Sequence, residues 1–311
     1  MTNDIFALWD ENKTRINDIS DIYTKNKYLL TRNKADAKKD YQQFLERYKF
    51  SDIPDYVPSS GMLEIMPKYS LFLQFKFFLS TPYISRDDEG FYIIDNPIKK
   101  DKVFKVPMVS GSSWKGNMRW VAQHIETDPA KIINLFGNEK KVEKDFKRGR
   151  LNFYTTFFNQ IGLEVINPHD RKTKAGIQPI YIESVPGGAD GTFSLLYMPF
   201  DLMGRPGTEV KEEVIKDLEA IYPAIKNMML TYGFSAKRSS GFGIAKNELS
   251  DVFCEMNGIE IKKSPKKDSK QKSKIKSFKE LKVKEQKTFN DLEDRLKAIV
   301  VKLLNSGGNN A

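Results

Sequence analysis

The stretch of residues 69–79, YSLFLQFKFFL, constrains the fold of this chain more than any other segment. Its odd positions are all apolar: Tyr69, Leu71, Leu73, Phe75, Phe77 and Leu79. Ser70, Gln74 and Lys76 lie between them. This alternation has the two-residue period of a β-strand with one buried face. We therefore expect a sheet whose apolar face is covered by other elements.

Further strands and helices follow from the same periodicities. The expected strands lie at residues 150–158, 192–200 and 242–249. The expected helices lie at residues 112–125, 128–136 and 209–232. Pro223 should kink the last of these helices. The order β-α-β-β-α-β predicts an α+β fold with a ferredoxin-like or RRM-like palm, interrupted by a polar connection at 80–110 and a long hairpin insertion at 159–190.

The remaining segments suggest a division into four regions. We expect a helical N-terminal extension over 1–68, the palm with its hairpin insertion over 69–258, a Lys-rich flexible linker over 259–287, and a C-terminal amphipathic helix over 288–306. Prolines and a glycine near the end of the first region mark a loop before the palm. The C-terminal helix could pack on its own domain or dock on a partner, and the sequence leaves both readings open.

The net charge of +10 comes mostly from one segment. Residues 259–287 hold 12 lysines and four acidic residues, a local net charge of +8. Such a run can be a solvated linker or an electrostatic arm for nucleic acid. Because the rest of the chain is close to neutral, global charge is weak support for a nucleic-acid partner.

The composition excludes several other classes of protein. A lone cysteine, Cys254, rules out a disulfide framework and a cysteine-based zinc site. With only His124 and His169, most multi-histidine metal centres are excluded as well. No apolar run approaches the roughly 18 residues of a membrane span, and the N-terminus lacks the apolar core of a signal peptide. We expect a cytoplasmic protein with no membrane partner.

Two segments carry residue types that bind phosphate. In residues 107–120, PMVSGSSWKGNMRW, the backbone N–H groups of Ser110, Gly111 and Ser112 would open a helix, where the helix dipole favours anions. Lys115 and Arg119 lie four residues apart on one face of that helix and could bind successive phosphates. The spacing of a Walker loop is absent.

The second phosphate-binding segment is residues 233–246, GFSAKRSSGFGIAK. Two adjacent cations, Lys237 and Arg238, precede Gly241 and Gly243, and a glycine-rich turn lets a ligand come close to the backbone. Two further segments add charge. Residues 84–101 are rich in acids, one of which could hold a divalent cation beside phosphate. The hairpin at 166–188 has a basic tip.

Taken in order, these segments resemble the RAMP superfamily of CRISPR type III effector complexes. The motifs that carry the resemblance are Asp95-Asn96-Pro97-Ile98, Gly111-Ser112-Ser113-Trp114-Lys115-Gly116 with Arg119, Leu135-Phe136-Gly137, Gly149-Arg150-Leu151, Asp170-Arg171-Lys172-Thr173, Glu183-Ser184-Val185-Pro186-Gly187 and Arg238 to Gly243. The sequence departs from the family pattern at Val109-Ser110 and at Pro168-His169. The resemblance covers residues 69–250 and leaves 1–68 and 259–311 uncovered.

The resemblance implies a subunit that stacks with others along a guide CRISPR RNA and is joined by other type III effector subunits. The implied RNA-binding residues are Ser112, Ser113, Lys115, Arg119, His169, Arg171, Lys172, Lys237, Arg238, Ser239, Ser240, Gly241 and Gly243. The hairpin insertion would be a thumb that displaces a base pair of the guide–target duplex. Asp95 would cut the target RNA, either directly or by holding Mg²⁺.

Three other readings stay open beside this one. The chain could be a capping or scaffold subunit that binds RNA without cutting it. It could instead be a RAMP endoribonuclease that processes guide RNA, with His124 or His169 as general base. A plain RRM-like RNA-binding protein is the third reading, but Phe242-Gly243-Ile244-Ala245 is a poor match to the aromatic strand motif of that class.

Overall fold

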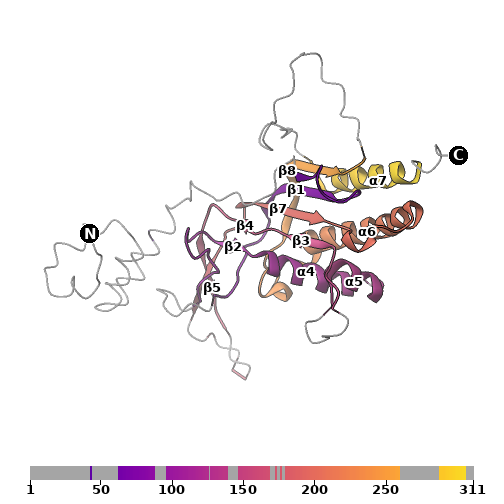
Figure 1. The fold of residues 1–311 in the computed structure, drawn as a ribbon. Coiled ribbons are helices and arrows are strands. Elements are labelled where there is room, and N and C mark those ends of the chain that lie inside the picture. The colour runs from indigo at the N-terminus through magenta and orange to yellow at the C-terminus, as the bar shows by residue number, and fades with distance from the viewer. Residues whose placement is uncertain are drawn as a thin grey trace, which may run out of the picture.

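The structure is a computed structural model that describes residues 43, 62–87, 96–125, 127–138, 146–168, 172–173, 176, 179–259 and 287–305. Several predictions fall outside these ranges. They concern the helices of the N-terminal extension, nearly all of the Lys-rich segment, and the site residues Asp95, His169 and Arg171. Figure 1 shows the arrangement of the described elements.

A four-stranded antiparallel sheet forms the centre of the fold (Figure 1). Its strands, in spatial order, are β3 (Leu151–Phe153), β7 (Asp190–Tyr197), β1 (Leu71–Leu79) and β8 (Ala245–Met256). β1 lies between β7 and β8, with Leu71 opposite both Tyr197 and Met256. The predicted α+β class is confirmed, and the sheet is antiparallel.

Helices cover one face of this sheet (Figure 1). They are α4 (Gly111–His124), α5 (Pro129–Phe136), α6 (Gly207–Asn227) and α7 (Phe289–Asn305). Pro223 lies inside α6, which passes into a π-helical turn, η4, over Met228–Tyr232. None of the helices in the described part of the chain combines the length and the apolar character that crossing a bilayer requires.

The alternating residues of β1 form the centre of the core. The five odd-numbered residues of this strand, from Leu71 to Leu79, are all fully buried. Phe75 stacks on Phe193, with ring centroids 5.1 Å apart. The opposite face of β1 is also buried at Phe72, contrary to the expectation of a single buried face, because residues 63–66 bring Leu63 and Met66 over a second apolar cluster.

The C-terminal helix packs on its own domain, which resolves the alternative that the sequence left open. Five residues of α7 belong to the main core: Phe289, Leu292, Leu296, Ile299 and Leu303. The Tyr222 hydroxyl donates to the Phe289 carbonyl oxygen at 2.8 Å. The ring of Phe289 contacts that of Phe75, with centroids 5.6 Å apart. α7 is therefore part of the layer that covers the sheet.

The expected strand at 150–158 is split into two. After β3, the chain forms β4 (Thr156–Phe157), which leaves the main sheet and pairs with β2 (Met108–Val109). The Trp114 indole N–H donates to the Thr156 hydroxyl at 3.0 Å, and that hydroxyl donates to the Thr192 carbonyl at 2.7 Å. These bonds hold β4 against the start of α4.

Two other strands differ from expectation in extent. β8 continues seven residues beyond the predicted end at 249, to Met256, because it pairs with β1 along its whole length across two register shifts. The insertion contains β5 (Gly162–Ile166) and β6 (Ile180–Ser184), which form a separate two-stranded antiparallel sheet. Lys172 lies in the turn between them and is exposed.

Candidate nucleic-acid interface

The start of α4 is built by three serines and a glycine. Ser110 is the N-cap, and its hydroxyl oxygen accepts the Ser113 N–H at 3.3 Å and lies 3.0 Å from the Ser112 hydroxyl. A Cβ on Gly111 would lie 2.4 Å from the carbonyl oxygen of Phe153, so only glycine permits this approach to β3. The first N–H groups of a helix lack carbonyl partners within the helix, so such a helix start suits an anion.

The glycine loop, residues 233–243, packs against the long connection between β1 and α4. Gly233 has φ +75°, and a Cβ there would lie 2.8 Å from the Phe242 carbonyl oxygen. A Cβ on Gly243 would lie 2.4 Å from that of Ser235. The Ser235 hydroxyl donates to the Ile84 carbonyl at 2.8 Å, so the loop has a fixed position beside residues 83–86.

Lys237 adopts a left-handed backbone conformation, with φ +57°, at the entrance to a short 3-10 turn over Arg238–Ser240. Non-glycine residues rarely adopt this conformation, and such strain concentrates at functional sites. Ser239, Ser240 and Gly241 follow and are exposed. The turn therefore presents two cations and two hydroxyls at the surface.

These segments meet around a cavity of about 440 Å³, here called the basic pocket. Its charged lining residues are Arg86, Lys99, Lys237 and Arg238. α4 contributes Ser113 and Asn117, and the Asn117 side-chain amide donates to the Phe234 carbonyl at 3.1 Å, which joins α4 to the glycine loop. Among the described residues that line it are four cations and no carboxylate, so this part of the pocket suits an anion.

Arg238 is held over an aromatic ring. Its guanidinium carbon lies 4.1 Å from the centroid of the Trp120 ring, and its Nη1 atom is buried with no hydrogen-bond partner among the described residues. His124 stacks on the same indole at 3.6 Å, with Nδ1 2.8 Å from the Trp120 carbonyl oxygen. Stacking leaves the donors of a guanidinium free to bind a phosphate.

A second group of cations lies near α4. Burial lowers the pKa of Lys115, and the positive charges of Arg119 and Arg148 lower it further. Residues that repel each other in this way would be stabilised by an anion between them. This second group is named the α4 cation cluster: Lys115, Arg119 and Arg148.

The basic pocket and the α4 cation cluster lie on opposite flanks of α4. Trp114 and Met118 point into the core, so helical periodicity places Ser113 and Asn117 on one side of them and Lys115 and Arg119 on the other. Gly116 lies between the flanks on the exposed outer face, and a Cβ there would have no neighbour within 4 Å. The structure therefore separates the predicted RNA-binding cations of α4 from those of the glycine loop by the width of one helix.

Two of the motifs that resemble the family, Leu135-Phe136-Gly137 and Gly149-Arg150-Leu151, have a structural role. A Cβ on Gly149 would lie 2.4 Å from the Phe136 carbonyl carbon, so these two motifs pack directly on each other. Arg150 is almost fully buried and donates to Asp217 at 2.5 Å and to both carboxylate oxygens of Asp201 at 2.8 and 2.6 Å. Tyr197 also donates to Asp217, at 2.7 Å. This ion network joins β3 and β7 to α6.

The segment that follows Asp95 is anchored to the hairpin. The Asn96 carbonyl accepts the Glu183 N–H at 2.9 Å, and the Asn96 side chain donates to the Tyr181 carbonyl at 3.4 Å. Asp95 itself lies outside the described residues. Among the residues that the structure does describe, no three acidic, histidine or cysteine side chains gather as a metal site would require. A Mg²⁺ bound by one carboxylate and RNA oxygens needs no such group.

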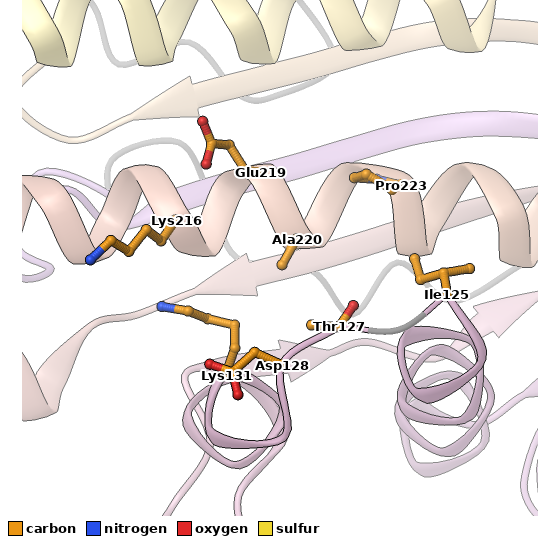
Figure 2. A pocket seen from close by; sticks show the side chains of 8 residues that line it. All are labelled: Ile125, Thr127, Asp128, Lys131, Lys216, Glu219, Ala220 and Pro223. Carbon is orange, nitrogen blue, oxygen red and sulfur yellow. The ribbon is translucent and has the colours of Figure 1, made fainter.

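Another pocket lies on the helical side of the molecule (Figure 2). It is bordered by α6 on one side and by the end of α4 and the start of α5 on the other. Its charged residues are of both signs: Asp128, Lys131, Lys216 and Glu219. None of the predicted RNA-binding residues that the structure describes lines it.

The residues of the interface that were not predicted from the sequence include Arg148 of the α4 cation cluster. Trp120 and Asn117 lie on the flank of α4 that faces the glycine loop, and their spacing from Ser113 could have indicated a shared face. Arg86 and Lys99 lie in the acid-rich segment, whose carboxylates were the predicted functional groups. No local signal shows that these two cations lie beside the glycine loop.

Comparison with known proteins gives consistent matches. The model of the RAMP superfamily matches residues 19–246, beginning well before Tyr69, where the motif resemblance begins. The CRISPR system Cms endoribonuclease Csm3 of Streptococcus thermophilus is 29% identical over 163 residues, covering 48% of this chain and 73% of that protein. The protein of the same name from Mycobacterium tuberculosis (strain ATCC 25618 / H37Rv) is 31% identical over 180 residues, with coverage of 48% and 73%.

One solved structure with a similar chain is the cryo-EM structure of the Type III-B Cmr-beta bound to cognate target RNA. The TM-score is 0.43 and the sequence identity 17%. The match covers 60% of this chain and 61% of that chain, which is less than two thirds of its length.

Proposed function

Because this chain belongs to the RAMP superfamily, we propose that it is a guide-RNA-binding subunit of a type III CRISPR effector complex. The observation that carries the proposal is the basic pocket beside α4, where the glycine loop contributes Lys237 and Arg238 and the connection before α4 contributes Arg86 and Lys99. A polyanion with regularly spaced phosphates matches two cation groups on either side of one helix. The guide backbone would cross the outer face of α4 at Gly116, from the basic pocket to the α4 cation cluster.

Under this proposal, the palm and the hairpin each have a defined role. The sheet order β3-β7-β1-β8, with α4 and α6 on one face, supports a ferredoxin-like palm. The β5–β6 hairpin would be the thumb that displaces a base pair of the guide–target duplex. The partners of the subunit would be guide CRISPR RNA, target RNA and the other effector subunits. The cytoplasmic location predicted from the sequence follows from these partners.

RNA binding is tested by the salt dependence of affinity. Lys115→Ala combined with Arg238→Ala removes one cation from each flank of α4. If each contacts a phosphate of single-stranded RNA, the slope of log K against log salt concentration should fall by about 1.4, or 0.7 per contact. Arg205→Ala with Lys216→Ala is the matched control, since both are exposed cations outside the pocket and the cluster. An unchanged slope in the first double variant would contradict the proposal.

We further propose that the subunit cuts target RNA through Asp95. Support comes from the relatives, which are named endoribonucleases, and from Asn96, the next residue, which bonds to the backbone of Glu183 and Tyr181 in β6. The carboxylate would activate the neighbouring 2′-hydroxyl of the target or hold a Mg²⁺ that does so. A bound Mg²⁺ would supply Lewis-acid stabilisation of the phosphate charge.

Cleavage is tested in the assembled complex. Asp95→Ala should abolish Mg²⁺-dependent cutting at this subunit's position and leave guide and target binding near wild type. Asp87→Ala is the matched control; Asp101 is unsuitable because its carboxylate accepts the N–H groups of Val103 and Phe104 at 2.9 and 2.8 Å. A target with a 2′-deoxy nucleotide at the scissile site should resist cutting. Unchanged cutting by Asp95→Ala would leave the scaffold reading in place.

The guide-processing alternative gains no support from His124. A general base must reach the proton it removes, whereas this imidazole stacks on Trp120 and directs Nδ1 to a backbone carbonyl. His169 lies outside the described residues, so its role as a guide-processing base stays a prediction. If the chain does not process guide RNA, as proposed here, His169→Ala should leave guide RNA length unchanged in co-expressed complexes, whereas longer guides would support the guide-processing alternative.

A further inference from the structure

A buried ion pair joins the base of the hairpin to the connection before α4. Lys100 Nζ lies 2.6 Å from Glu183 Oε2, and the two side chains are only 6% and 2% exposed. The same carboxylate oxygen accepts the Ile98 N–H at 3.1 Å. A buried ion pair often adds no more stability than apolar residues of the same volume. The main effect of the Lys100–Glu183 pair is therefore to fix the geometry of the segments that it joins.

That geometry concerns Lys99, which lies between the two residues bound by Glu183. In extended backbone, alternate residues point to opposite sides, so Ile98 and Lys100 point inward and Lys99 points the other way. Ile98 and Lys100 are indeed buried, and Lys99 lines the basic pocket. The Lys99 N–H also donates to the Ser85 hydroxyl at 2.9 Å. The backbone on each side of Lys99 is thus fixed.

We propose that Glu183 and Lys100 are a positioning pair that holds Lys99 in the basic pocket, where Lys99 contacts one phosphate of the guide RNA. The inference rests on the proposed function, since it names an additional contact in that interface. The positioning pair is buried and does not touch RNA. Through it, the hairpin and the pocket keep a fixed spacing, so that both engage the same RNA in register.

The test measures salt dependence in the full-length chain with fluorescein-labelled poly-uridine RNA. Lys99→Ala should lower the slope of log K against log salt concentration by about 0.7, the value of one contact to single-stranded RNA. Glu183→Gln and Lys100→Met should each lower it by a similar amount. When Glu183→Gln or Lys100→Met is added to Lys99→Ala, the slope should not fall further, because all three substitutions remove the same phosphate contact.

Glu164→Gln is the matched control. Glu164 lies on β5, opposite Ile182 of β6, so the substitution makes the same change of charge on the same hairpin. Its slope should equal that of the wild type. Thermal midpoints are measured on every sample, and titrations are performed below the lowest midpoint. If the Glu183→Gln variant does not fold, the test uses the Lys100→Met variant instead. Methionine fills a volume similar to that of lysine, and Glu183 keeps its hydrogen bond to Ile98.

Three results would overturn the inference while wild-type RNA binding stays intact. They are an unchanged slope in Lys99→Ala, an unchanged slope in both positioning variants, and a further loss when either is added to Lys99→Ala. Failure of the wild-type chain to bind RNA would instead refute the proposed function, so the two failures are distinguishable.

Discussion

Gly116 offers a test in which folding and binding should respond in opposite directions. It lies inside α4 on the exposed face, its φ is outside the left-handed region, and a Cβ there would meet no atom within 4 Å. The fold therefore does not require glycine at this position. A glycine inside a helix costs about 1 kcal/mol relative to alanine. Its presence is explained if a ligand backbone passes close to the helix at this point.

Gly116→Ala should accordingly stabilise the isolated chain and weaken its binding to RNA. The expected gain of about 1 kcal/mol corresponds to a rise of about 2–4 °C in the thermal midpoint for a domain of roughly this size. A methyl group forced into a tight contact costs about 1–3 kcal/mol, which corresponds to a loss of affinity of about 5-fold to about 150-fold. The assays are thermal unfolding followed by circular dichroism and titration of labelled guide RNA.

Gln123→Ala is the control for the Gly116 experiment. Gln123 is exposed and lies two helical turns further along the same face of α4, and it lines neither the basic pocket nor the α4 cation cluster. Its replacement should leave affinity unchanged. If Gly116→Ala binds RNA as tightly as the wild type, the guide does not cross α4 at this point. If it lowers the thermal midpoint, the helix is not as open there as the structure shows.

Three further outcomes are expected. Trp120→Leu should lower RNA affinity about two- to fivefold in a filter-binding titration, since stacking at a partly exposed site contributes about 0.5–1 kcal/mol. Asp217→Asn should destabilise the chain by about 3–5 kcal/mol in urea unfolding, because it leaves Arg150 buried with a weakened partner. The pKa of Asp201 is lowered: burial opposes ionisation, but Arg150 more than offsets it. Stability should therefore be fully present above the normal carboxyl pKa near 4 and be lost as pH falls through the lowered value, and Arg150→Met should remove part of this dependence.

The regular elements could be predicted because their patterns are local. The alternation in β1 and the apolar faces of α4 and α6 are visible within single windows of sequence, and the structure contains all three. The β2–β4 pair could not be predicted, because two-residue strands have no measurable period. The burial of Phe72 on the second face of β1 depends on residues 63–66, which lie outside the strand.

The candidate site was predictable only in part, for the same reason. Serine, lysine and glycine motifs indicated two phosphate-binding loops, and the structure places members of both around one pocket. The Glu183–Lys100 pair spans 83 residues of sequence, and no window contains both partners. A glutamate in a strand and a lysine in a polar loop each look solvent-exposed until the fold brings them together.

Charge counting is a poor guide to this interface because burial changes the meaning of each cation. Lys100, Lys131 and Arg150 count toward the net charge, yet each is held by carboxylates inside the fold and none is available to RNA. Lys99, next to one of them in sequence, faces the basic pocket. The Lys-rich segment contributes most of the excess charge without any arrangement that the sequence can define. Long-range attraction to a polyanion depends on the total charge, whereas the path of a bound strand depends on where a few cations are fixed. The second property is the one that the positioning pair and the glycine of α4 control.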